Sequence, residues 1–178
     1  FALLVLEGVH LYRGEPAEVV ALGDEVVALA REYGLAQEKE WGRAFQGSAF
    51  TQLGRLDEGI DQLKDSLVVQ QAIGSGLVRT AFLALLADPL CRAGRLDEGL
   101  RAIDEGFAHA ERMAEGGYLA ELHRMRGELL RARGDAVAAE ASFRAAMEQA
   151  ETQQAKSFEL PAATGLAKLL IDLGRQTH

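Results

Sequence analysis

The chain has 178 residues, of which 48% are hydrophobic and 26% charged, and its formal net charge at pH 7 is −8. This composition supports a sizeable buried core, and the acidic balance argues against a general affinity for nucleic acid or anionic membranes. The longest apolar stretch, Thr80 to Ala87, is much shorter than the roughly 20 residues that a membrane-spanning helix needs. The single cysteine, Cys91, cannot form an internal disulfide, which fits a reducing, cytoplasmic environment.

A glycine recurs every forty residues along the chain, at Gly14, Gly54, Gly94, Gly134 and Gly174. A fixed period of this size is the signature of stacked supersecondary units. It predicts one repeat domain over residues 1–178, with a half repeat at 1–13, units at 14–53, 54–93, 94–133 and 134–173, and a stub at 174–178. Because the chain begins inside an apolar run and stops four residues after the last of these glycines, we expect a fragment of a larger protein.

Two helices are predicted in each unit. From Asp57 to about Ile73 the apolar residues fall mostly three or four apart, and a Gly-Ser-Gly sequence at 74–76 ends the run as a connection between helices. A second helix is expected from Val78 to Arg92, closed by Gly94, which accepts the left-handed conformation that follows a helix C-terminus. The acidic residues just after each turn fall in the first turn of the next helix, where carboxylates face the positive end of the helix dipole.

Superposing the units at a shift of forty residues predicts the core, because several positions keep their size. In the first helix of each pair a small residue stands three positions before a large one: Gly47, Ala87, Gly127 and Ala167, then Phe50, Leu90, Leu130 and Leu170. In the second helix a small position is followed by two large ones: Gly59, Gly99 and Ala139, then Leu63, Ile103 and Phe143, then Val27, Leu67, Phe107 and Met147. A glycine inside a helix costs about 1 kcal/mol relative to alanine, so these glycines indicate close helix contact.

The pattern around the turns resembles the tetratricopeptide repeat (TPR), lengthened here to forty residues from the usual length of about 34. The residues that carry the resemblance are the small and large positions before the turn and the sequence Gly-Arg-Leu-Asp-Glu-Gly, which occupies 54–59 and again 94–99. The resemblance covers nearly the whole chain. It implies an all-α fold, a right-handed superhelical solenoid of antiparallel helix pairs, in which the first helix of each pair lines the concave face.

Two segments, residues 120–130 and 154–164, look like the C-terminal repeat region of large bacterial signalling proteins. In those proteins an ATPase module precedes the repeats, and a cyclase or transcription-regulator domain lies elsewhere in the chain. This second resemblance covers about half of the chain. It implies a scaffold or sensor segment and not the catalytic part.

Catalytic and metal-binding patterns are lacking in the sequence. The Gly-Ser-Gly sequence at 74–76 has neither the lysine nor the preceding strand of a phosphate-binding loop. The histidines, at positions 10, 109, 123 and 178, have no one-turn partner and third donor of the kind zinc needs. We therefore expect no enzyme activity, no metal and no cofactor.

A binding surface is expected on the concave face that the TPR resemblance implies. Its candidate residues, each on a predicted first helix, are Trp41, Ser48, Asp88, Arg124, Glu128, Arg131 and Lys168. Trp41 is the only tryptophan and is either an anchor for a peptide, since interface hot spots favour Trp and Arg, or a packing residue against the preceding repeat.

The arginines of this set allow two interpretations. Arg124 and Arg131 flank Glu128 by four and three residues, so all three side chains can form an ion network on one helix. Alternatively, the two guanidinium groups grip a carboxylate of a peptide or an acidic ligand with bidentate geometry. Two further pairs, Asp88 with Arg92 and Lys168 with Asp172, are expected to be solvated ion pairs.

Two functional hypotheses remain. The first is a scaffold that binds a protein, a peptide or a neighbouring domain of its own parent chain. The second is a sensor in which a small ligand enters the groove and regulates an attached ATPase, cyclase or transcription regulator. In addition, the segments Phe1–Leu11 and Leu166–Leu173 are expected to expose repeat faces through which a homodimer forms.

Overall fold

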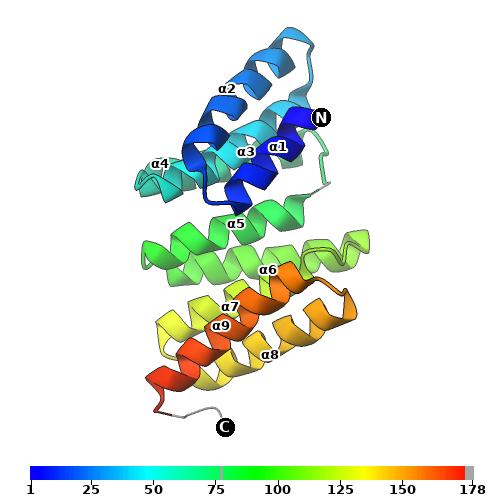
Figure 1. The fold of residues 1–178 in the computed structure, drawn as a ribbon. Coiled ribbons are helices and arrows are strands. Elements are labelled where there is room, and N and C mark those ends of the chain that lie inside the picture. Colours follow the sequence, from blue (N-terminus) through cyan, green and yellow to red (C-terminus); the bar gives the residue numbers. More distant parts are fainter. Residues whose placement is uncertain (77, 175–178) are drawn as a thin grey trace. The chain divides into compact units, whose positions relative to one another are not determined.

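The computed structural model describes residues 1–76 and 78–174, and the regular structure of these residues is entirely α-helical (Figure 1). The helices are α1 (Ala2–Tyr12), α2 (Pro16–Glu32), α3 (Ala36–Gln52), α4 (Leu56–Ala72), α5 (Arg79–Arg92), α6 (Leu96–Met113), α7 (Leu119–Arg133), α8 (Ala136–Thr152) and α9 (Lys156–Asp172). Successive helices pack as antiparallel pairs, which confirms the expected architecture. The helices predicted at 57–73 and 78–92 are correct to within one residue at each end. Residues 175–178, which include His178, lie outside the described part.

The chain divides into two compact units, Phe1–Pro89 and Leu90–His178, here called unit 1 and unit 2. In unit 1, α2 packs against both α1 and α3, and α3 packs against α4. In unit 2, α7 packs against α6 and α8, and α8 packs against α9. First helices also contact each other, α1 with α3 and α7 with α9. The extent of the single repeat domain, its repeat borders and its right-handed superhelical course stay predictions.

The turn at Gly54 shows how the glycine ladder works. Its φ is 84°, a left-handed value that a side chain would disfavour, and the next amide, of Arg55, donates back to the carbonyl of Phe50 at 2.9 Å. All five ladder glycines have positive φ, between 66° and 88°. Midway between them the same conformation recurs at Gly34, Gly74, Ala114 and Gln154. The chain therefore turns every twenty residues.

The starts of the second helices carry the predicted acidic residues, Asp57 and Glu58 in α4 and Asp97 and Glu98 in α6. The structure adds a partner for each glutamate. Arg95 donates to both carboxylate oxygens of Glu98 at 2.8 and 2.9 Å, and Arg55 does the same with Glu58. The repeated Arg-Leu-Asp-Glu sequence thus ties the turn to the first turn of the helix.

The predicted small and large positions meet inside each helix pair. A methyl group on Gly59 would collide with the backbone of Gly47, and one on Gly127 would lie within 2.9 Å of ring atoms of Phe143. Four of the predicted large residues, Leu63, Leu90, Ile103 and Phe143, are fully buried. Phe50 and Leu130 are only half-buried, because they lie beside turns; the guanidinium group of Arg55 covers the Phe50 ring at 4.0 Å. Val27, Phe107 and Met147 are also half-buried.

Candidate interaction surface

The first residues of the expected site lie on α7, where a bidentate ion pair has formed. Arg124 donates through Nε and Nη2 to the two carboxylate oxygens of Glu121, at 2.8 and 2.6 Å. Both side chains are about one-fifth exposed. The sequence allowed Glu128, four residues on, as the partner of Arg124, and the structure selects Glu121, three residues back. The ion network of the first interpretation therefore exists with a different pairing.

Arg131 joins α7 to α9. It donates to Glu128 through Nε and Nη2, at 3.2 and 2.9 Å, and through Nη1 to Asp172 of α9 at 3.2 Å. These carboxylates, Glu128 first, raise the pKa of Arg131 above its usual range. The predicted pair of Lys168 with Asp172 is not formed, because Asp172 bonds to Arg131 and the Lys168 side chain is exposed.

Together these side chains form one surface, which we call the α7–α9 face: Glu121, Arg124, Glu128, Arg131, Lys168 and Asp172. On α9 the exposed residues Leu160, Thr164 and Ile171 fall on the same helical face as Lys168, because they are spaced by three or four residues. Leu160 and Ile171 are 72% and 73% exposed. The surface therefore offers apolar area next to guanidinium and carboxylate groups, which is the chemistry of a protein-binding surface.

The equivalent positions of unit 1 are different. Trp41 is only 6% exposed and Ser48 is also buried, since both lie on α3, which α1, α2 and α4 contact. The expected surface anchor at Trp41 is therefore not observed, and the alternative, a packing residue, is the one found. Asp88 is exposed on α5 and engages in interactions of its own. The structure thus places Arg124, Glu128 and Arg131 on α7 and Lys168 on α9, Asp88 on α5 of unit 1, and Trp41 and Ser48 at buried positions of α3.

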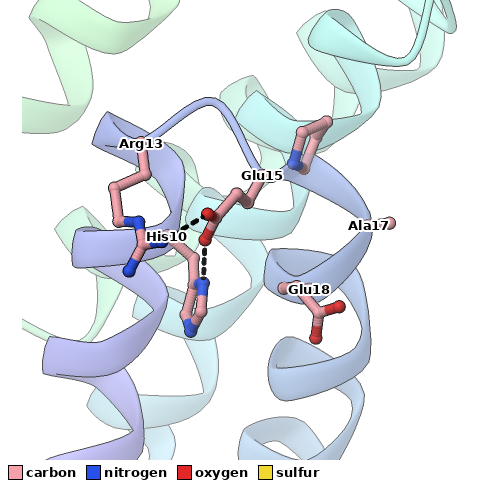
Figure 2. A pocket seen from close by; sticks show the side chains of 6 residues that line it. His10, Arg13, Glu15, Ala17 and Glu18 are labelled. Atoms are coloured by element: carbon pink, nitrogen blue, oxygen red, sulfur yellow. Dashed lines mark hydrogen bonds and ion pairs between the residues drawn. The ribbon is translucent and has the colours of Figure 1, made fainter.

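A shallow depression lies beside the turn between α1 and α2 (Figure 2). Glu15 bonds there to His10 at 2.6 Å and to Arg13 at 2.8 Å, and the depression continues along Pro16, Ala17 and Glu18. The hydrogen bond with His10, followed by the attraction of Arg13, lowers the pKa of Glu15. This cluster could not be predicted from the sequence, because its members are joined across a turn and follow no helical spacing.

A second depression lies between α6 and α7 and is lined by Asp97, Leu100, Arg101, Asp104, Arg126, Leu130 and Arg133. Asp97 and Arg133 form an ion pair across it at 3.4 Å. Neither this depression nor the one at the α1–α2 turn includes Arg124, Glu128 or Arg131. The sequence signal for it was the Arg-Leu-Asp-Glu repeat, of which Asp97 is a member.

Solved structures with a similar fold are TPR-like repeats. The chain is similar to crystallised TPR-like repeats described as those of a candidate kinesin light chain of Podosopora anserina, with a TM-score of 0.67 and 16% identity over 97% of this chain and 86% of that one. A point variant of that protein gives the same TM-score, with 17% identity over 97% and 85% of the two chains. The fold is TPR-like.

A bacterial protein is distantly similar to this TPR-like chain in sequence. An uncharacterized protein of Rhizobium meliloti (strain 1021) is 27% identical over 168 residues, which is 92% of this chain and 16% of the relative. The TPR-like array thus spans about one-sixth of the length of the curated relative that it matches. No family model matches the chain.

The described residues of the TPR-like array contain no group of three or more His, Cys, Asp and Glu side chains placed to hold a metal ion. None of the described helices combines the length and apolar character that crossing a membrane requires.

Proposed function

We propose that this TPR-like array is a protein-interaction scaffold that binds a peptide or a neighbouring domain on the α7–α9 face. The observation that carries the proposal is that α7 presents two arginines, Arg124 and Arg131, while the adjoining first helix, α9, exposes Leu160 and Ile171. Interface hot spots favour arginine together with large apolar side chains that become buried on binding. The α7–α9 face offers both.

In the proposed binding mode, a carboxylate of the partner takes the place of a glutamate beside Arg124 or Arg131. Arg124 and Arg131 are each held in a fixed orientation by a glutamate on their own helix, and ion pairs three residues apart on one helix contribute only a few tenths of a kcal/mol. A carboxylate of the partner can therefore share or replace Glu121 or Glu128 at little cost and gain bidentate geometry. Apolar side chains of the same partner would cover Leu160 and Ile171.

The proposed setting is a longer bacterial protein. The Rhizobium relative is about six times the length of the matched segment, so a repeat array that contacts other domains of its own chain fits this comparison. A cytoplasmic signalling protein, in which the array reports to an attached ATPase, cyclase or regulator domain, is the context we propose. Nucleic acid and membrane surfaces are not proposed as partners, because the chain carries a net charge of −8.

The test selects binding peptides from a displayed random library and compares two double variants. Arg124→Ala with Arg131→Ala is expected to weaken the selected peptides at least about tenfold, the loss of about 1.4 kcal/mol or more in binding free energy. The matched control is Arg55→Ala with Arg95→Ala, which removes two arginines with the same i,i+3 bidentate geometry outside the α7–α9 face. Equal affinity of both double variants for the peptides would reject this surface.

The small-ligand sensor stays a prediction with a separate test. A sensor pocket needs convergent polar groups in an enclosed site, whereas the arginines of the α7–α9 face line neither of the two depressions described above. Titration with a metabolite library, measured as the melting temperature, distinguishes the two functions. A reproducible increase with one metabolite, lost in the Arg124→Ala and Arg131→Ala variant, would favour the sensor.

A further inference from the structure

Helix α7 carries a second row of arginines on the side opposite the first. Arg126 and Arg133 are seven residues apart, which is about two helical turns, so they share one side of α7. They follow Arg124 and Arg131 by two residues each, which is about 200° around the helix. The second row lines the depression between α6 and α7 together with Arg101 of α6, and the first row does not. Three arginines from two helices therefore face one depression.

The two rows of α7 differ in their partners. Each arginine of the first row donates two hydrogen bonds to the carboxylate of a glutamate three residues earlier on the helix. The second row has no carboxylate at such a spacing, because the residues three and four positions from its arginines are those at 122, 123, 129, 130, 136 and 137. Within the part of the chain that the structure describes, Arg126 and Arg101 form no hydrogen bond or ion pair. Arg133 has one ion pair there, with Asp97 at 3.4 Å.

No carboxylate is bonded to Arg126, so its charge acts on other neighbours. One of them is His123, one turn earlier on α7, whose ring lies against that of Phe107 with the centroids 4.6 Å apart. Burial, and after it the positive charge of Arg126, lower the pKa of His123. A guanidinium group with no bound carboxylate keeps its attraction for an anion from outside the chain.

The repeat register shows that helix packing does not require these arginines. At a shift of forty residues, the equivalents of Arg126 are Leu6, Gln46, Leu86 and Leu166. The equivalents of Arg133 are Arg13, Leu53, Ala93 and Leu173, and those of Arg101 are Ala21, Asp61 and Ala141. Arginine stands at all three positions only in α6 and α7. The three arginines are therefore a feature of this depression and not of the repeat.

The depression between α6 and α7 combines positive charge with apolar surface. Its volume is about 420 Å³, in the range of small-ligand sites, and the partly buried Leu100 and Leu130 belong to its lining. Two aspartates, Asp97 and Asp104, line it as well, so three arginines and two aspartates leave one net positive charge. The whole chain, by contrast, has a net charge of −8. Such a lining favours a ligand that places an anionic group on the arginines and an apolar group on the leucines.

A phosphate monoester suits these donors better than a carboxylate does. It carries a charge of about −1.5 to −2 at pH 7 and three acceptor oxygens, whereas a carboxylate has a single charge and two oxygens. Arginines of both helices can therefore donate to the phosphate at once. The excess of positive charge in the lining also attracts a dianion more strongly than a monoanion.

We propose that the depression between α6 and α7 binds a phosphate monoester carried by an apolar group. Arg101 and Arg126 donate to its oxygens, and Arg133 joins them by releasing Asp97. The leucines of the lining contact the apolar group. Two sources have this chemistry, a phosphorylated side chain of a protein and a small phosphate ester. The inference does not depend on the α7–α9 face, because it uses the other row of arginines.

The probe for the test is phenyl phosphate, which joins a phosphate monoester to an apolar ring. Titration into the protein is followed by NMR of the backbone amides of α6 and α7 and of the arginine Nε–H groups, and saturable shifts are expected at Arg101 and Arg126. Benzoate, which has one charge, and inorganic phosphate, which has no ring, are each expected to bind at least about threefold more weakly. A phosphoserine peptide with flanking leucines separates the two sources. Binding tighter than that of phenyl phosphate assigns the site to a protein partner, and weaker binding assigns it to a small ester.

Two double variants of α7 compare the rows of arginines. Arg126→Gln with Arg133→Gln is expected to weaken binding of phenyl phosphate at least about tenfold, because two of the three donors are lost. The matched control, Arg124→Gln with Arg131→Gln, removes two arginines at the same spacing on the same helix and is expected to leave the affinity unchanged. The control pair is the one expected to weaken peptides selected on the α7–α9 face, so failure of one proposal is distinguished from failure of the other.

A third variant is expected to bind more tightly. Asp104→Asn removes a negative charge from the lining and should strengthen binding of phenyl phosphate about threefold. Loss of folding cannot produce such a gain, so this variant separates an effect on binding from an effect on stability. Three results would overturn the proposal: no saturable shift with phenyl phosphate, equal loss in both double variants, or benzoate or inorganic phosphate bound as tightly as phenyl phosphate.

Discussion

The two units of this array share one repeat but differ in what they bury. Among the described residues, the buried polar side chains of unit 1 include Glu7, Glu40, Gln46, Ser66 and Gln70, whereas those of unit 2 are His109 and Ser142. Several of the unit 1 groups have no hydrogen bond: both oxygens of Glu7, both amide atoms of Gln70 and the indole nitrogen of Trp41. Buried polar groups without partners cost stability. The same helix arrangement thus tolerates a polar core in one unit and has an apolar core in the other.

One pair of positions shows the difference most clearly. In unit 2 the first helix supplies a small residue, Gly127, and the second helix a large one, Phe143. In the first helix pair of unit 1 the sizes are exchanged, because α1 supplies Glu7 and α2 supplies Gly23, whose added methyl group would lie 2.8 Å from a Glu7 oxygen; the second pair, Gly47 and Leu63, keeps the order of unit 2. The repeat therefore preserves the combined volume of the pair and not its chemistry. Burial then raises the pKa of Glu7 to about 8.

Removing the large member of the unit 2 pair is expected to have the largest effect. Phe143→Ala would leave a cavity against Gly127 and Gly165 and lower the free energy of unfolding by about 3–5 kcal/mol. Glu7→Ala removes the large member of the unit 1 pair and is expected to cost less, because it also removes a buried carboxyl group. Denaturant unfolding measures both variants. If Glu7→Ala is the more destabilising of the two, the contrast between the pairs is wrong.

The buried carboxyl group predicts a pH dependence that belongs to unit 1. The pKa of Glu7 is higher in the folded chain, about 8, than its ordinary value of 4.5, so the folded state binds more protons in this range. The contribution of Glu7 to stability is complete below pH 4.5 and is lost as the pH rises to about 8. Since one pKa unit corresponds to about 1.4 kcal/mol, the loss between about pH 5 and about pH 8 is roughly 3 kcal/mol.

Glu7→Gln is expected to flatten this profile and to stabilise unit 1 at about pH 8, because it keeps the shape of the side chain and cannot ionise. Amide exchange of α1 and α2 across this pH range measures the effect by residue. The control, Glu18→Gln, changes an exposed carboxyl group on α2 and should leave the profile as it is. A Glu7→Gln profile as steep as that of the parent chain would show that another group carries the titration.

Substitutions in the turns are expected to change the free energy of unfolding least. In the turns, unit 2 has the less favourable backbone conformation. Its turn between α6 and α7 places Ala114 at φ 52°, where unit 1 has Gly74 at φ 72°. Ala114→Gly is expected to raise the free energy of unfolding by about 0.5–1 kcal/mol, because relief of the left-handed strain exceeds the entropy that glycine adds to the unfolded chain. Gly94→Ala should lower it by about 1 kcal/mol for the converse reason. Thermal unfolding of the two variants would contradict this account if both shifted in the same direction.

The helices and their close contacts could be predicted because they depend on local, periodic features. The small and large positions recur at a fixed spacing, and contacts such as Gly127 with Phe143 follow directly from them. Of the second set of turns only the one at 74–76 was predicted, because Ala114 and Gln154 keep the left-handed conformation without keeping glycine. Similarity in sequence and similarity in backbone conformation are therefore different signals.

The candidate site was harder to predict than the fold. Arg124 has glutamates three residues before it and four residues after it, and both spacings bring side chains together on a helix. Spacing alone could not select Glu121. Burial of Trp41 depends on the helices around α3, which the sequence of α3 does not specify. Position on a first helix was therefore not enough to predict exposure.

The left-handed turns also limit how such a chain can change in length. They recur at positions 14, 34, 54, 74, 94, 114, 134, 154 and 174, and each of those from 14 to 154 has one helix on either side. Gain or loss of one twenty-residue segment would exchange the first and second helices from that point on and bring small positions opposite small ones. Gain or loss of forty residues would restore every pairing. Duplication or deletion in this chain should therefore proceed in whole pairs of helices, so that the array lengthens by discrete steps of one repeat.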